Sequence, residues 1–151
     1  MIEELKEKLL TLSQYLTRSH EFFVPLARLY VARVFFLSGV NKVSDWDTTL
    51  FLFMNEYQVP LLPPVMAAFT GAFGELFFSV LLALGIQTRL SALALFFVNI
   101  VAVISYYSTL VALPAAFMDH IEWGIILGLL LSTAPCLLSV DYQWSKFRSK
   151  G

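Results

Sequence analysis

The sequence predicts an all-α membrane protein, an antiparallel bundle of four transmembrane helices with an N-terminal amphipathic helix. Composition is the first indication, since 58% of the 151 residues are hydrophobic and 14% are charged. Soluble domains have roughly 45–50% apolar and about 25% charged residues. The second indication is four segments that approach the length of about 20 apolar residues needed to cross a bilayer. The net charge of −1 leaves no basic footprint for nucleic acid, so the lipid bilayer is the expected partner.

The expected spans form a transmembrane domain over 22–141, followed by a cytoplasmic tail at 142–151. They lie at about 22–40, 62–85, 90–110 and 121–138. The second and third spans are joined by a short turn, which makes them antiparallel neighbours. A longer connection precedes the second span and ends in the run PLLPP, whose prolines end helices and stiffen the approach to that span.

Residues 1–21 have the pattern of a separate amphipathic helix. Apolar residues recur at three- and four-residue steps, with charged residues between them. The apolar positions are Ile2, Leu5, Leu9, Leu12 and Leu16. Such a helix lies on a membrane surface in the simpler interpretation, and docks onto a partner in the other.

Lysine and arginine residues predict the orientation in the membrane. They precede the first span, occupy the turn after the second and follow the fourth: Lys6, Lys8, Arg18, Arg89, Lys146, Arg148 and Lys150. Connections rich in these residues stay in the cytoplasm. Both termini are therefore expected to be cytoplasmic.

Glu75 lies about halfway along the second expected span, where an ionised carboxylate costs roughly 2.5–3.5 kcal/mol on insertion scales. Small residues at four-residue steps surround it, which is typical of closely packed membrane helices. We expect a buried charge network of Arg28, Arg33, Glu75 and Asn99, in which Glu75 pairs with one of the two arginines. A static ion pair and a proton- or ligand-handling site are equally good interpretations of this network.

A second polar cluster is expected at the outer ends of the spans. It contains Asn41 and Lys42 after the first span, and Asp119, His120 and Glu122 at the start of the fourth. His120 and Glu122 are candidate metal ligands, because imidazole and carboxylate groups bind Zn, Fe or Cu. Residues two apart on a helix do not face the same way, however, and a polar rim at the membrane surface is the simpler interpretation.

The sequence contains none of the common catalytic motifs. There is no nucleophile elbow, no phosphate-binding glycine loop and no HExxH or CxxCH, and Cys136 is the single cysteine. We therefore expect no catalysis by this chain alone.

Four motifs, in this order, resemble the DoxX family. They are Arg28 followed by GVNK at 39–42, FGE at 73–75, LGIQTRLSA at 84–92 and SVD at 139–141. The resemblance covers roughly residues 24–144 and implies a four-helix protein of the bacterial inner membrane. It also implies family positions at Arg28, Lys42, Glu75, Arg89 and Asp141, with Arg89 and Asp141 expected to pair at the cytoplasmic edge. The stretch at 44–64 is similar to a subgroup found beside genes for copper-binding modified peptides, the bufferin-type systems.

The resemblance leaves different functions open. Some DoxX relatives are associated with quinone-linked thiosulfate oxidation and others with thiol homeostasis, which implies a non-catalytic subunit that holds a quinone or an oxidoreductase partner. This function predicts an opening lined by Phe77, Phe78, Phe96 and Phe97 that leads to Glu75. The alternative is a metal- or metallopeptide-handling transport module, which with four spans would have to form a homo-oligomer. A scaffold whose polar core only fixes the packing is the third interpretation.

Overall fold

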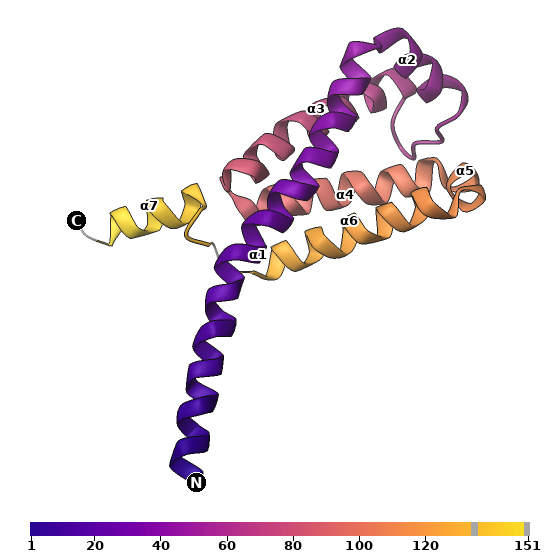
Figure 1. Cartoon of the computed structure of the whole chain (residues 1–151). Helices are drawn as coiled ribbons and strands as arrows, with labels where there is room; N and C mark the ends of the chain where they lie inside the picture. The colour runs from indigo at the N-terminus through magenta and orange to yellow at the C-terminus, as the bar shows by residue number, and fades with distance from the viewer. Residues whose placement is uncertain (134–135, 150–151) are drawn as a thin grey trace.

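The computed structural model describes residues 1–133 and 136–149, except for the side chains of residues 14 and 16–18. Within these ranges the chain forms seven α-helices (Figure 1): α1 (Ile2–Ser44), α2 (Trp46–Asn55), α3 (Pro64–Leu84), α4 (Thr88–Ser105), α5 (Tyr107–Ala112), α6 (Pro114–Ser132) and α7 (Val140–Arg148). In this part of the chain four helical segments are long and apolar enough to cross a membrane: Ser19–Ser44 within α1, and all of α3, α4 and α6. The chain is thus an all-helical, multi-pass membrane protein, as its composition predicts.

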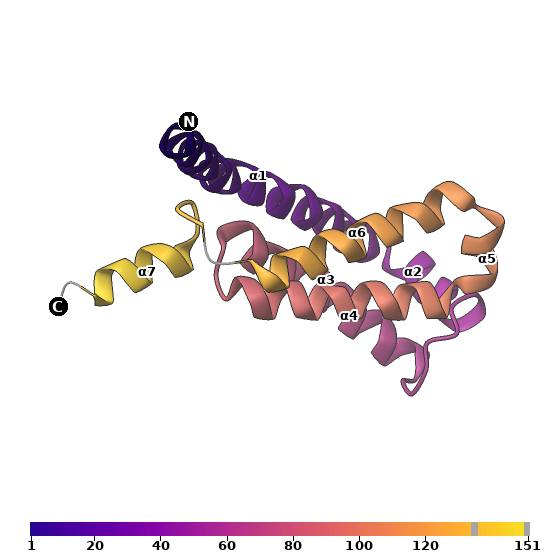
Figure 2. The same cartoon turned by 90° about the horizontal axis from the view of Figure 1, so that it is seen from below.

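The four spanning segments pack around one apolar core. α1 lies against α3, α3 against α4, and α4 against α6; Figure 2 shows the last two side by side. The buried core residues come from all four helices: Val31, Ala32, Phe35, Leu82, Ala92, Leu95, Leu127 and Leu130. Large apolar side chains also point outward, and Phe69, Phe97 and Leu129 are each about 60% exposed. This surface suits a bilayer, where lipid covers apolar side chains.

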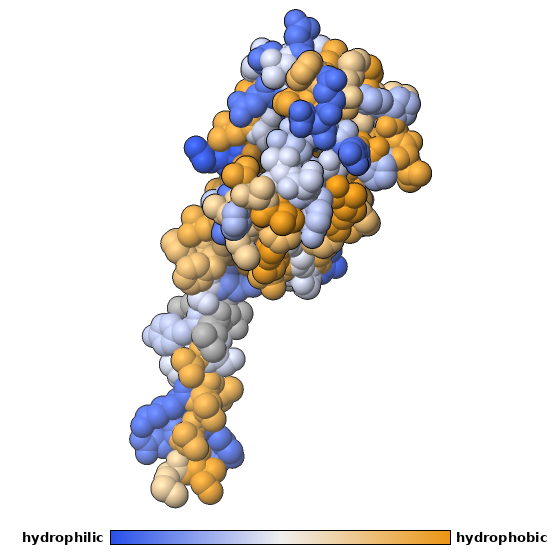
Figure 3. All heavy atoms as spheres, turned by 90° about the vertical axis from the view of Figure 1, so that its right-hand side faces the viewer, coloured by the Kyte–Doolittle hydropathy of each residue, from blue (hydrophilic) through white to orange (hydrophobic). Residues whose placement is uncertain are grey.

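α1 is one continuous helix of 43 residues, so the expected amphipathic segment at 1–21 is not a separate element. No glycine precedes Gly39 to end the helix, and Pro25 within it removes a single backbone donor. The N-terminal half projects from the bundle (Figure 1). Figure 3 shows a strip of hydrophobic residues running along this projection, with hydrophilic residues beside it.

The ends of the spans differ from the expected positions. α1 continues to Ser44 instead of ending at 40, and α4 ends at Ser105 instead of 110. α6 starts at Pro114, because proline favours the first position of a helix, where no backbone donor is needed. The polar residues at 119–122 therefore lie inside this helix rather than at its start.

The C-terminal part also differs from the expectation. α6 ends at Ser132, where the expected fourth span runs to 138. Residues 134–135 of that span, and 150–151 of the expected tail, lie outside the described residues. Most of the tail forms α7, which Figure 2 shows outside the bundle.

Candidate functional site

Glu75 is buried near the middle of α3, where it forms an ion pair with Lys42 of α1. The Lys42 Nζ atom lies 2.9 Å from Glu75 Oε1 and 2.7 Å from Oε2, and it donates to Ser38 Oγ at 2.8 Å. All three ammonium hydrogens therefore have an acceptor. Because Glu75 is only 6% exposed, the ion pair offsets the cost of holding its charge inside the bundle.

The expected pairing of Glu75 with an arginine is wrong. The apolar pattern places Lys42 beyond the first span, but α1 continues past it and the long side chain reaches Glu75. Gly39, one turn before Lys42, allows this approach. A Cβ atom on Gly39 would lie 2.8 Å from Leu76 Cγ and 3.2 Å from Glu75 Cβ, so only glycine leaves α1 and α3 this close.

A threonine of α2 and a tyrosine of the following segment lie next to the residues of the ion pair. Thr49 of α2 donates to the Lys42 carbonyl at 3.0 Å. Tyr57, which lies outside the spans, contacts Phe53 and Tyr106 with ring centroids 4.9 Å apart in each case. Burial, together with nearby Tyr106 and Glu75, raises the pKa of Tyr57 above its usual value.

Asn99 does not join Glu75 but forms two hydrogen bonds with His120, which connect α4 to α6. Asn99 Nδ2 donates to the His120 carbonyl, and His120 Nδ1 lies 2.8 Å from Asn99 Oδ1. An amide oxygen only accepts, so His120 Nδ1 carries the proton in this pair. Gly124 leaves room for Asn99, since a Cβ atom there would lie 3.3 Å from Asn99 Nδ2.

The expected outer cluster does not form one site. Asn41, Asp119 and Glu122 are exposed, while Lys42 and His120 point to different partners inside the bundle. Across residues 1–133 and 136–149, no three His, Cys, Asp or Glu side chains gather in a way that could hold a metal ion. The geometry therefore offers His120 and Glu122 no further ligands for a metal.

At the opposite end of the bundle, Asp141 caps α4 instead of pairing with Arg89. Its carboxylate accepts from the backbone N–H groups of Gln87 and Thr88, both at 2.8 Å, and from Thr88 Oγ1 at 3.0 Å. Arg89 donates to the Thr133 carbonyl at 3.4 Å. The expected Arg89–Asp141 pair is wrong because the start of α4 offers unsatisfied N–H groups and a positive dipole end, which attract a carboxylate.

We expect replacement of Asp141 with alanine to lower the free energy of unfolding by about 0.5–2 kcal/mol, the usual cost of losing a helix cap. Thermal unfolding in detergent micelles measures this loss. Asn at the same position keeps an acceptor oxygen and should retain part of the stability. An unchanged unfolding temperature in the alanine variant would contradict the capping role.

Arg28 is a buried residue of α1 that holds the segment before α7. It is 3% exposed, donates to the Leu138 carbonyl at 2.8 Å and places Nη1 3.8 Å from Cys136 Sγ. Glu21, two turns earlier on α1, accepts from the Leu137 N–H at 2.6 Å. We call these contacts of Glu21 and Arg28 with 136–139 the inner clamp. Arg28 is thus engaged far from Glu75.

Arg33 points outward from the middle of the first span. Its exposed side chain borders a groove of about 230 Å³ between α1 and α3, whose other walls are almost entirely apolar: Leu29, Ala32, Phe36, Ser79, Val80 and Ala83. Among the described contacts, no hydrogen bond or ion pair engages its guanidinium group. Sequence reasoning missed this exposure, although Arg33 is turned about 140° from the buried Arg28 on a helix of about 100° per residue.

The phenylalanines of α3 and α4 do not line this groove. Phe78 and Phe96 pack against the apolar core, and Phe77 and Phe97 are exposed on the outside of the bundle. The expected aromatic opening toward Glu75 thus does not coincide with the groove beside Arg33.

Comparison with known proteins gives the family. A family model described as DoxX matches residues 23–108, from α1 into α5, which include Arg28, Lys42, Glu75 and Arg89. Neither a curated protein nor a solved structure matches the chain. Because the family model covers more than half of the sequence, the protein belongs to the DoxX family.

Proposed function

We propose that the protein is a non-catalytic membrane subunit of a redox system and holds a quinone head group against Arg33, in the groove between α1 and α3. The observation that carries the proposal is the exposed Arg33 at mid-span. A charged side chain at this depth costs roughly 2.5–3.5 kcal/mol on insertion scales, and a ligand with acceptor oxygens offsets part of that cost. Quinone carbonyls are such acceptors, and guanidinium groups only donate.

The size and walls of the groove suit this ligand. Small-molecule sites usually have about 300–1,000 Å³, and the groove has about 230 Å³ with an almost wholly apolar lining. It therefore fits a ring rather than a whole lipid-soluble molecule. The apolar tail would lie in the surrounding bilayer, against the outward-facing side chains of α1.

The Lys42–Glu75 ion pair supports the groove from outside it. Every hydrogen of the Lys42 ammonium group is already used, so this pair has no donor left for a ligand. It fixes α1 against α3 instead, and these two helices form the walls of the groove. In the proposal Glu75 thus positions the site without touching the ligand.

Quinone content of the purified protein tests the proposal. We expect wild-type protein in mild detergent to retain quinone near one per chain, and Arg33→Leu to bind about tenfold more weakly, as loss of a hydrogen bond to a charged group predicts. Extraction followed by mass spectrometry measures both. Tyr30→Leu is the matched control, because Tyr30 is an exposed polar residue one turn away on α1. Absence of quinone from the wild type, or equal content in Arg33→Leu, would overturn the proposal.

We also propose the bacterial inner membrane as the location, with antiparallel spans and both termini in the cytoplasm. The distribution of basic residues supports this orientation. Cys136 is buried, so a Cys136→Ser background can carry one new cysteine at an exposed position. We expect an impermeant maleimide added to whole cells to label Glu56→Cys but not Ser149→Cys. The reverse pattern would invert the proposed orientation.

The metal- or metallopeptide-handling alternative, including the copper-linked bufferin-type subgroup, has less support. His120 Nδ1 is engaged with Asn99, and Glu122 is exposed on the surface of α6. A quinone-free protein with unchanged copper tolerance after His120→Ala would leave the scaffold function as the better proposal.

A further inference from the structure

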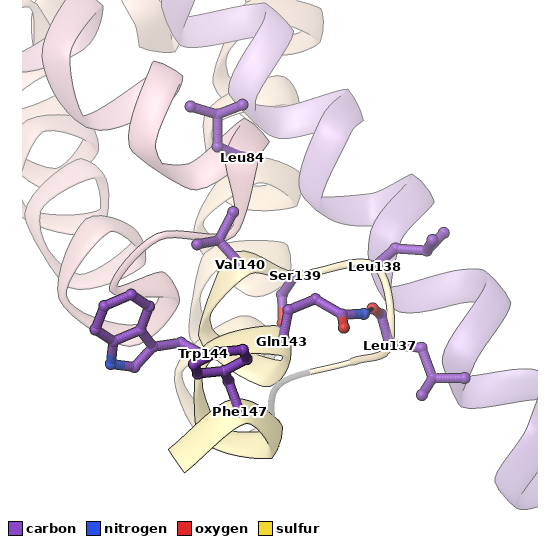
Figure 4. Close-up of a pocket in the computed structure, with 8 residues that line it drawn as sticks. All are labelled: Leu84, Leu137, Leu138, Ser139, Val140, Gln143, Trp144 and Phe147. Carbon is purple, nitrogen blue, oxygen red and sulfur yellow. Dashed lines mark hydrogen bonds between the residues drawn. The ribbon is translucent and has the colours of Figure 1, made fainter. Parts of the chain in front are cut away.

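A second groove lies between the end of α3 and helix α7. It has a volume of about 570 Å³, and its walls come from Leu84, from the segment 137–139 and from α7. Figure 4 shows Val140, Trp144 and Phe147 gathered on the same side of α7, below Leu84. Gln143, which also lines the groove, donates to the Leu137 carbonyl at 2.8 Å and so ties α7 to the preceding segment.

The apolar side of α7 is left uncovered by the described chain. Val140, Trp144 and Phe147 follow each other at four- and three-residue steps, so they share one face of the helix. Trp144 is 64% exposed and Phe147 is 83% exposed. Uncovered apolar patches of this kind mark interaction surfaces.

The position of the groove favours lipid as its occupant. Leu84 is the last residue of a membrane-spanning helix, so the groove continues the lipid-facing surface of α3. The groove also contains Trp144, and tryptophan is enriched in the headgroup layer, where membrane-spanning helices end.

The charges on α7 favour an anionic lipid. Arg148 follows Trp144 by four residues and therefore lies on the same side of the helix, one turn further from the bundle. Asp141, the acidic residue of α7, has its carboxylate engaged by the start of α4. The free charge beside the groove is thus positive.

We propose that this groove binds an anionic phospholipid, with an acyl chain against Leu84, Val140, Trp144 and Phe147 and with the phosphate near Arg148. The inference goes beyond the quinone site, since the two grooves share no lining residue. It assigns α7 to the headgroup layer of the membrane.

Fluorescence of Trp144 in reconstituted vesicles tests the proposal. The full chain with Trp46→Phe and Trp123→Phe keeps Trp144 as its single tryptophan. We expect bromines on the acyl chains of phosphatidylglycerol to quench Trp144, and phosphatidylglycerol to be preferred over phosphatidylcholine about fivefold, as one basic group at an anionic surface predicts. In the same background Arg148→Gln should remove the preference while quenching persists.

A variant that keeps only Trp123, which packs inside the bundle, is the matched control and should show no headgroup preference. Quenching of Trp144 by aqueous iodide but not by brominated lipid would place the face in water and overturn the proposal. Equal quenching by both lipids would overturn its anionic part. If Trp144 is protected from iodide only at a high protein-to-lipid ratio, a second copy of the chain covers the groove. This result would also contradict lipid binding.

Discussion

Lys42→Met is expected to lower the free energy of unfolding by about 3–5 kcal/mol, the usual cost of leaving one partner of a buried ion pair unpaired. The variant keeps Glu75 in the middle of α3 but removes its counter-charge, and Glu75 is too buried for water to replace Lys42. Methionine keeps an unbranched chain as far as Cε, so the loss reports mainly the ammonium group rather than the packing of its stem. Unfolding by a denaturing detergent, followed by circular dichroism, measures the effect.

The double variant Lys42→Met/Glu75→Gln separates the charge from the packing. It removes both ions, and replacing a buried ion pair with neutral groups is often close to neutral for stability. We therefore expect the double variant to recover most of the stability that Lys42→Met loses. A double variant no more stable than Lys42→Met would contradict an ion pair that serves to neutralise Glu75.

Gly85→Ala is expected to destabilise the end of the bundle from which α7 follows. Gly85 ends α3 with φ of 69°, a left-handed conformation that costs about 1–3 kcal/mol for other residues. A Cβ atom there would lie 2.6 Å from Ser139 Cβ and 2.8 Å from Ser139 Cα, and would also collide with Arg28. Both the turn and the inner clamp are thus disturbed, so the unfolding temperature should fall sharply.

Gly128→Ala is the matched control for this variant. Gly128 lies within α6, and a Cβ atom there meets no other atom within 4 Å. Alanine is favoured over glycine in a helix by about 0.5–1 kcal/mol, so this variant should be unchanged or slightly more stable. If Gly85→Ala were as stable as Gly128→Ala, the close contact with Ser139 and Arg28 would be disproved.

The four apolar segments and the inward direction of Glu75 are accessible from the sequence, because periodicity and small-residue spacing are local properties. The partner of Glu75 is not. Hydropathy marks where an apolar run ends, whereas α1 continues to Ser44 through residues that are polar but still helical. A helical wheel also gives no information on how closely two helices approach, and here the contact at Gly39 brings Lys42 within reach.

The partner of Asp141 is also not accessible from the sequence. The sequence offers Arg89 as the nearest opposite charge, but the carboxylate binds backbone N–H groups that a sequence pattern does not display. Arg33 is the converse case. Its charge suggests an inward position. The face of α1 that carries Arg28 and Val31 packs against the core, however, and Arg33 lies on the opposite, exposed face.

The inner clamp has a consequence for how the chain is made. Residues 136–141, which are synthesised after all four spanning helices, supply the acceptor for Arg28, the donor for Glu21 and the cap of α4. A nascent chain that has inserted α1, α3 and α4 therefore holds a buried arginine without its carbonyl and a helix start without its carboxylate. This end of the bundle therefore closes only after residues 136–141 have been synthesised and have reached α1 and α4.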